Sequence, residues 1–206
     1  MPGPELFAVS PNLGQDLVKS VIALFVVIDP VGSVPVFIAL TSRMQKAERA
    51  EVSKTAIVTA AILLFVFAFA GSQILVIFGV TIFSFMIAGG VLLFIVAIEL
   101  LTHGEWRFGG VSMQGESGVV PLAFPLLAGP GAITAVIISF QTSGLVTTAL
   151  SILIVIGITF VVLKFVDQIY RVLGRRGSMI ITRVFAVFIA AIAVQFMVQG
   201  AKELFM

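Results

Sequence analysis

Six long runs of apolar residues, separated by short polar connections, dominate the chain. They cover residues 16–40, 55–78, 82–101, 119–140, 146–167 and 180–200. One helical crossing of a bilayer needs roughly 17–25 mostly apolar residues, and each run reaches that length. The pattern therefore predicts an all-α, polytopic membrane protein with six transmembrane helices. The boundary between the second and third runs depends on one short turn, at Gly79.

Composition agrees with a lipid environment. Apolar residues make up 60% of the chain and charged residues only 11%, whereas soluble domains carry about 25% charged residues. The chain has no cysteine and one histidine, His103, so disulfide chemistry is excluded and a histidine–cysteine zinc site is not expected. The sequence contains no phosphate-binding loop, dinucleotide fingerprint or metal-ligand cluster. We therefore expect no enzymatic activity, no cofactor, no metal ion and no nucleic-acid partner.

Lysine and arginine residues lie mostly on one side of the predicted bundle. The connections on that side and their flanks carry Arg43, Lys46, Arg49, Lys54, Arg107, Lys164, Arg171, Arg175, Arg176 and Arg183, and the other side carries Lys19 and Lys202. Because basic connections stay in the cytoplasm, we expect a multi-pass protein of the cytoplasmic (inner) membrane with both termini outside. Residues 44–54 are predicted to form a short helix at the cytoplasmic surface, and residues 102–118 a loop.

Proline and glycine interrupt two of the six runs. The first interruption reads Asp29-Pro30-Val31-Gly32-Ser33-Val34-Pro35 and the second Pro125-Leu126-Leu127-Ala128-Gly129-Pro130-Gly131. Proline removes a backbone donor and clashes with the preceding turn, so each motif should break its helix. Inside a bilayer, the freed backbone groups need partners in the protein, in a cavity or in a ligand.

The two breaks fall in the first and fourth predicted helices. The chain is therefore predicted to be a single transmembrane domain over residues 1–206, with one three-helix repeat at about 16–101 and a second at about 119–203. An odd number of crossings in each repeat gives the two repeats opposite topologies. Broken helices at matching positions of inverted repeats are typical of a transporter binding site.

The residues around both breaks are candidates for substrate binding. A carboxylate at the centre of a membrane helix costs about 2.5–3.5 kcal/mol, so Asp29 should face a polar interior, where it meets a substrate ammonium or takes up a proton. Asp29 can also cap the next half-helix, and this role is compatible with the first. Half-helix N-termini offer N–H groups to a substrate carboxylate. The substrate-binding candidates are Asp29 (also the coupling residue), Pro30, Gly32, Ser33, Gly129, Pro130, Gly131, Ala132 and Thr134, with Gln195 and Gln73 as secondary candidates.

These motifs resemble those of the MarC family, integral membrane proteins whose name reflects a proposed link to multiple antibiotic resistance. The first break resembles the family's (Asn/Asp)-Pro-(Ile/Val)-Gly-(Asn/Ser)-x-Pro motif. The segment Phe124-Pro125-Leu126-Leu127-Ala128-Gly129-Pro130-Gly131-Ala132-Ile133 is similar to the second signature almost throughout. The segments Ile87-Ala88-Gly89-Gly90 and Ala190-Ala191-Ile192-Ala193-Val194-Gln195 also match. The resemblance covers nearly the whole chain.

Some members of this family are described as transporters of small neutral amino acids such as glycine and alanine. The resemblance implies the same task here, with the substrate between the broken helices and coupling to protons, or to sodium, across the lipid bilayer. Many members carry Asn where this chain has Asp29, so the coupling chemistry does not transfer directly. Two alternatives stay open: a channel-like pore or exporter for another small solute, and a non-transporting membrane regulator. A monomer and an oligomer are both compatible with the sequence.

Overall fold

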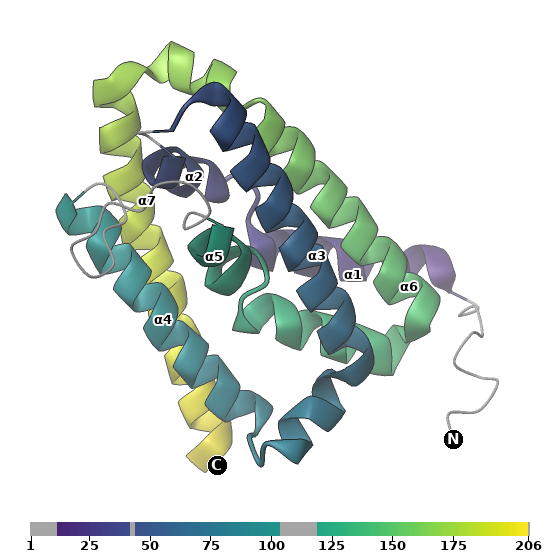
Figure 1. Cartoon of the computed structure of the whole chain (residues 1–206). Helices are drawn as coiled ribbons and strands as arrows, with labels where there is room; N and C mark the ends of the chain where they lie inside the picture. The colour runs from purple at the N-terminus through teal and green to yellow at the C-terminus, as the bar shows by residue number, and fades with distance from the viewer. Residues whose placement is uncertain (1–11, 42–43, 104–118, 206) are drawn as a thin grey trace.

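The computed structural model describes residues 12–41, 44–103 and 119–205. Over these residues the chain is helical and contains no strand, as predicted (Figure 1). The elements are α1 (Leu13–Ile28), α2 (Ser33–Thr41), α3 (Lys46–Ile77), α4 (Ile82–His103), α5 (Val119–Pro121), the wider-wound segment η4 (Leu122–Leu127), α6 (Pro130–Lys164) and α7 (Val166–Phe205).

Four of the described helices are long and apolar enough to cross a membrane. These are α3, α4, α6 and the Thr182–Leu204 part of α7. In contrast, α1 has 16 residues and a length of about 24 Å at 1.5 Å per residue, less than the roughly 30 Å of hydrocarbon. The structure thus confirms the all-helical class and gives, among the described residues, four candidate spans where the sequence predicts six.

Helix α6 consists of two arms joined by a sharp bend at Gly144. This residue has φ 77° and ψ −179°, a conformation that is essentially restricted to glycine. The hydroxyls of Ser139 and Thr148 hydrogen-bond at 2.9 Å across the bend, although a straight helix would separate these positions by about 13 Å along its axis. The fourth apolar run therefore comprises α5, η4 and the first arm of α6, the fifth run forms the second arm, and the predicted boundary between the two runs lies at this bend.

Helix α3 begins earlier than predicted. The expected separate surface helix at 44–54 is not formed, because the chain runs from Lys46 to Ile77 without interruption. The Glu48 carboxylate accepts the Gln45 backbone N–H at 2.9 Å and so fixes the start. No glycine or proline lies between residues 46 and 54 to end the helix there. The turn at Gly79, with φ 64°, separates α3 from α4 as predicted. Most of the predicted loop at 102–118 lies outside the described residues.

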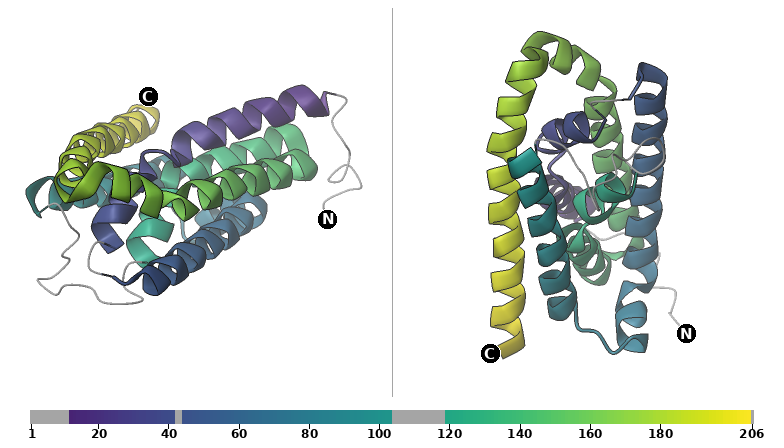
Figure 2. Two further views of the ribbon diagram at one scale, coloured as in Figure 1. Left: turned by 90° about the horizontal axis from the view of Figure 1, so that it is seen from above. Right: turned by 60° about the vertical axis from the view of Figure 1, so that its left-hand side comes forward.

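The helices divide into two groups with separate cores. Helices α4 and α7 lie side by side along one edge of the molecule (Figures 1 and 2) and share a small core. Gly90 of α4 allows this contact, since a Cβ at that position would lie 2.8 Å from the Ala193 carbonyl oxygen of α7. A larger core joins α1, α3, η4 and α6. Helix α2 contributes Phe37 to the larger core and Val36 to the smaller one.

Candidate substrate site between two helix breaks

The first break is closed by the Asp29 side chain. Helix α1 ends at Ile28, and Asp29 adopts a left-handed conformation with φ 45° and ψ 71°. Pro30 follows and has no N–H with which to continue the helix. The Asp29 carboxylate turns back and accepts the N–H of Gly32, three residues on, through Oδ1 at 2.9 Å, which is a local side-chain cap of the following half-helix. The capping role considered for Asp29 is therefore present in the structure.

The other backbone donors of the first break are also paired within the turn. The Ser33 N–H donates to the Asp29 carbonyl at 2.9 Å, and the Val34 N–H donates to the Val31 carbonyl at 3.1 Å. The Ser33 hydroxyl donates to the Asp29 carbonyl at 2.9 Å and lies 3.4 Å from the Ile28 carbonyl. In this structure the turn itself therefore uses the amides of Gly32 and Ser33, which the sequence offered as donors to a substrate carboxylate.

The second break offers backbone donors in place of a side chain. It follows η4, and the Ala128 N–H donates to the Ala123 carbonyl at 2.8 Å. Helix α6 then begins behind Gly129, which has no side chain to cap the helix, and no side-chain cap hydrogen bond is formed. Pro130 occupies the first turn and carries no N–H. The amides of Gly131 and Ala132 are therefore the leading donors at the positive end of the α6 dipole.

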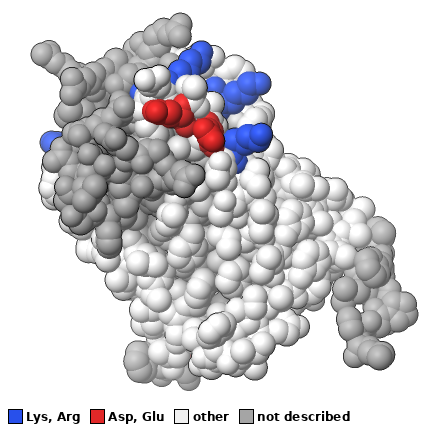
Figure 3. All heavy atoms as spheres, in the orientation of Figure 1, with Lys and Arg blue, Asp and Glu red and all other residues white. Residues whose placement is uncertain are grey.

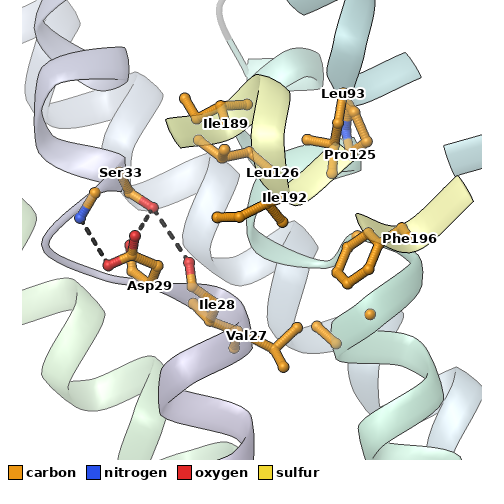
Figure 4. A pocket seen from close by; sticks show the side chains of 14 residues that line it. Val27, Ile28, Asp29, Ser33, Leu93, Pro125, Leu126, Ile189, Ile192 and Phe196 are labelled. Atoms are coloured by element: carbon orange, nitrogen blue, oxygen red, sulfur yellow. Dashed lines mark hydrogen bonds between the residues drawn. The ribbon is translucent and has the colours of Figure 1, made fainter. Parts of the chain in front are cut away.

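Both breaks meet at one cavity of about 40 Å³. Six predicted residues line it: Asp29, Gly32, Ser33, Gly129, Gly131 and Ala132. Figure 4 shows the hydrogen-bonded Asp29 and Ser33 at one side and an apolar wall of Leu126, Ile189, Ile192 and Phe196 opposite them. A volume of at least about 10–15 Å³ is needed to hold one water, so the cavity is large enough for water.

The other sequence candidates lie elsewhere. Pro30 is buried and does not line the cavity, and Pro130 packs on Gly89 of α4. Gln73 and Gln195 are exposed and line neither this cavity nor the larger hollow beside it. Gln195 points away from the cavity because the neighbouring Phe196 faces it, and successive side chains of a helix are turned by about 100°. Both glutamines are therefore poor candidates for substrate contact.

A larger hollow of about 560 Å³ lies beside the cavity. Its polar lining residues are Asp16, Lys19, Ser20, Thr134, Ser139, Thr142, Ser143 and Gln199. Thr134, a predicted binding residue, belongs here, and its hydroxyl is buried without a hydrogen-bond partner among the described residues. The Ser20 and Ser139 hydroxyls lie 3.0 Å apart and join α1 to the first arm of α6.

Three residues line both the small cavity and the large hollow: Val27, Gly131 and Phe196. They approach so closely that a Cβ at Gly131 would overlap the Phe196 ring and lie 2.8 Å from Val27 Cγ1. The Phe196 ring on α7 is thus one wall of a thin partition. Sequence reasoning missed Phe196, Leu93, Ile189 and Ile192, because an apolar residue in a span looks the same whether it faces lipid or a cavity.

Comparison with known proteins agrees with this architecture. The profile of the MarC family integral membrane proteins matches residues 14–205. A UPF0056 membrane protein of Archaeoglobus fulgidus is 40% identical over 190 residues, which cover 87% of this chain and 89% of the relative. The UPF0056 membrane protein YhcE of Escherichia coli is 35% identical over 202 residues, which cover 91% and 92%. No solved structure matches the chain. With nearly its whole length matched, the chain belongs to the MarC family of integral membrane proteins.

Proposed function

We propose that this chain is a secondary transporter of small neutral amino acids such as glycine and alanine. The supporting observation is that Asp29 and the uncapped N-terminus of α6 line the same cavity. A zwitterion needs this pair, an anion for its ammonium and N–H donors for its carboxylate. The amides of the first break are used within their own turn. In this proposal the substrate carboxylate therefore accepts hydrogen bonds from the amides of Gly131 and Ala132 alone.

Substrate size follows from the wall of the cavity. Its lining beyond the two breaks is apolar, with Leu93, Ile189, Ile192 and Phe196, so a charged side chain would lose its hydration there without a partner. Glycine has five heavy atoms, and the cavity of about 40 Å³ must expand even for this substrate. Alanine adds one methyl group, and larger amino acids require still more expansion.

Alternating access would then be a movement of the α4–α7 pair against the other helices. The cavity lies at the seam between the two cores, with Leu93 of α4 and Ile189 of α7 on one side and the breaks on the other. A shift of α7 that withdraws Phe196 would join the cavity to the 560 Å³ hollow. In this scheme the large hollow is the route to one side of the membrane.

The proposed topology has six crossings in two inverted repeats. Helices α1 and α2 would together make the first crossing, and α5, η4 and the first arm of α6 the fourth. On the face seen in Figure 3, the charged side chains gather at one end of the molecule, over the start of α3. The positive-inside rule places that end in the cytoplasm and both termini outside. A transporter of this kind needs no enzymatic activity.

Asp29 would also be the group that couples transport to protons. Its carboxylate is the titratable side chain among the described residues that line the cavity. In family members with Asn at this position, the amide oxygen can make the same turn without a titratable proton. Protonation of Asp29 would remove the charge that holds the ammonium and thereby release the substrate.

The test compares two variants in proteoliposomes that contain the purified protein. Asp29→Asn keeps an oxygen for the Gly32 N–H but removes the charge, whereas Asp29→Ala removes both. We expect saturable [¹⁴C]glycine uptake with trans-stimulation in the unmodified protein, driven by an inward proton gradient. We expect a reduction of at least tenfold in proton-driven uptake in both variants, with near-normal thermal stability only in Asp29→Asn.

Three results would contradict the proposal. Proton-driven uptake by Asp29→Asn at the normal rate would remove the carboxylate from coupling. Solute flux without saturation or trans-stimulation would identify a channel-like pore. Absence of both flux and amino acid-dependent thermal stabilisation would favour the non-transporting regulator, since a ligand that binds the folded state stabilises it.

A further inference from the structure

A second hollow, of about 490 Å³, lies at the basic end of the molecule and takes no part in the proposed transport path. It is formed by residues of α2, α3, α6 and the start of α7. Its charged lining residues are Lys46, Arg49, Lys54 and Lys164, and no carboxylate occurs among the described residues that line it. The ammonium groups of Lys46, Lys54 and Lys164 around one space repel each other, and a bound anion would relieve that repulsion.

The basic side chains come from two helix ends held next to each other. Residues 46, 49, 50, 53 and 54 share one face of α3, at the three- and four-residue spacing of a helix, and Lys164 ends α6. The Arg49 guanidinium is oriented by its Nε, which donates to the Thr41 carbonyl at 3.0 Å. The hollow is therefore a shaped site with one anchored guanidinium and three ammonium groups.

The rest of the lining is apolar. Phe37, Leu163 and Val166 form a buried floor, with 1%, 2% and 4% of their surface exposed. Phe160 and Phe165 also line the hollow but are 43% and 52% exposed. Positive charge beside an exposed aromatic surface, at the end of membrane-spanning helices, matches an amphiphile with an anionic head and an apolar tail. A free anion would use only the charges.

We propose that this hollow binds the phosphate group of an anionic phospholipid, with the acyl chains against Phe160 and Phe165. Basic pockets between transmembrane helices at the cytoplasmic side are the usual binding places for such headgroups. The proposal does not depend on the transported substrate. The floor residue Phe37 belongs to α2, the half-helix that follows the first break, so an occupied site would also hold α2 in place.

The experiment measures lipid binding to the purified, delipidated protein in a neutral detergent. Thermal unfolding and native mass spectrometry are recorded with added phosphatidylglycerol, with phosphatidylcholine, and with inorganic phosphate alone. We expect phosphatidylglycerol to raise the Tm by several degrees and to give a retained lipid at the lowest concentrations. We expect phosphatidylcholine and inorganic phosphate to do neither.

Matched double variants test the location. Lys54→Gln with Lys164→Gln should raise the phosphatidylglycerol concentration needed for half-maximal retention about tenfold, and Lys164→Gln alone should raise it less. The control, Lys19→Gln with Lys202→Gln, removes the same charge from other parts of the chain. It should leave the phosphatidylglycerol concentration for half-maximal retention unchanged. Lys54→Arg with Lys164→Arg keeps both charges and should bind phosphatidylglycerol as the unmodified protein does.

The outcomes that overturn the proposal are distinct. Equal retention by the two glutamine pairs would mean that the lipid binds elsewhere. Equal stabilisation by phosphatidylcholine would show that the headgroup charge is irrelevant. Equal stabilisation by inorganic phosphate would assign the site to a free anion. If the double variant does not fold, unchanged retention by Lys164→Gln alone would still count against the site.

Discussion

At the scale of single residues, the structure shows one of the two compatible roles that the sequence predicts for Asp29, the capping of the next half-helix. Its Oδ1 atom accepts the Gly32 N–H and closes the turn, while the residue also lines the cavity between the breaks. A carboxylate has two oxygens and can accept several hydrogen bonds. One side chain can therefore cap a half-helix and hold a substrate ammonium, which is why Asp29→Asn and Asp29→Ala should differ in stability but not in uptake.

The Phe196 ring separates the small cavity from the large hollow, and this role can be tested directly. The chain contains no cysteine, so a single introduced cysteine reports its own accessibility. Ser33→Cys places a thiol at the cavity, where Ser33 is 1% exposed. We expect Phe196→Ala to increase the rate at which a membrane-impermeant thiol reagent, added from the side of the large hollow, modifies this cysteine by at least tenfold.

The control for this prediction is Thr142→Cys, which lines the large hollow and is already exposed. Its modification rate should be the same with Phe or Ala at position 196. A rate at Ser33→Cys that does not respond to Phe196→Ala would mean that the ring is not the barrier.

At the scale of elements, the bend at Gly144 decides where α6 goes. Without it the two arms would form one straight helix of 35 residues, about 52 Å long, which exceeds the bilayer. With it, the chain changes direction and Ser139 lies against both Thr148 and Ser20. The bend therefore holds the N-terminus of α6 next to the first break.

Glycine substitutions within α6 test this bend. Gly144→Ala should lower the free energy of unfolding by about 1–3 kcal/mol, because φ 77° with ψ −179° is unfavourable for any residue with a Cβ. Gly157→Ala in the second arm is the matched control: nothing lies within 4 Å of the added Cβ, and alanine favours a helix. Thermal unfolding in detergent should show a loss only for Gly144→Ala. Equal Tm values for the two variants would mean that the bend does not require glycine at position 144.

At the scale of the whole molecule, the helices group across the two halves of the chain. The last helix of the first half, α4, pairs with the last helix of the second half, α7, and the remaining helices form the larger core. The cavity lies where the two groups meet. In the proposed mechanism, a movement of α4 and α7 relative to the other helices would open the site at this seam.

The orientation of the molecule gives the prediction at this scale. Thr142 lies at the large hollow, and Gln45 lies beside the basic hollow at the start of α3; both are exposed. In intact cells, we expect an impermeant thiol reagent to label Thr142→Cys and to label Gln45→Cys only after permeabilisation. The reverse pattern would place the basic end outside and invert the proposed topology.

The sequence by itself determined the helical class, the turn at Gly79 and both break positions. These features are local: an apolar run of about 20 residues requires a helix in lipid, and proline ends a helix through its own missing N–H and ring. The family motifs at residues 29–35 and 124–133 could also be recognised from the sequence, because each is a short continuous segment.

Only the tertiary structure decided which groups face each other. It paired the amides of the first break inside their own turn, left those of Gly131 and Ala132 as the leading donors of α6, and turned Gln73 and Gln195 outward. It also selected Phe196 from nineteen phenylalanines. Hydrophobicity is shared by lipid-facing, core and cavity-lining residues, so the chain alone cannot distinguish them. That choice depends on helix rotation, which is set by contacts between residues far apart in the sequence.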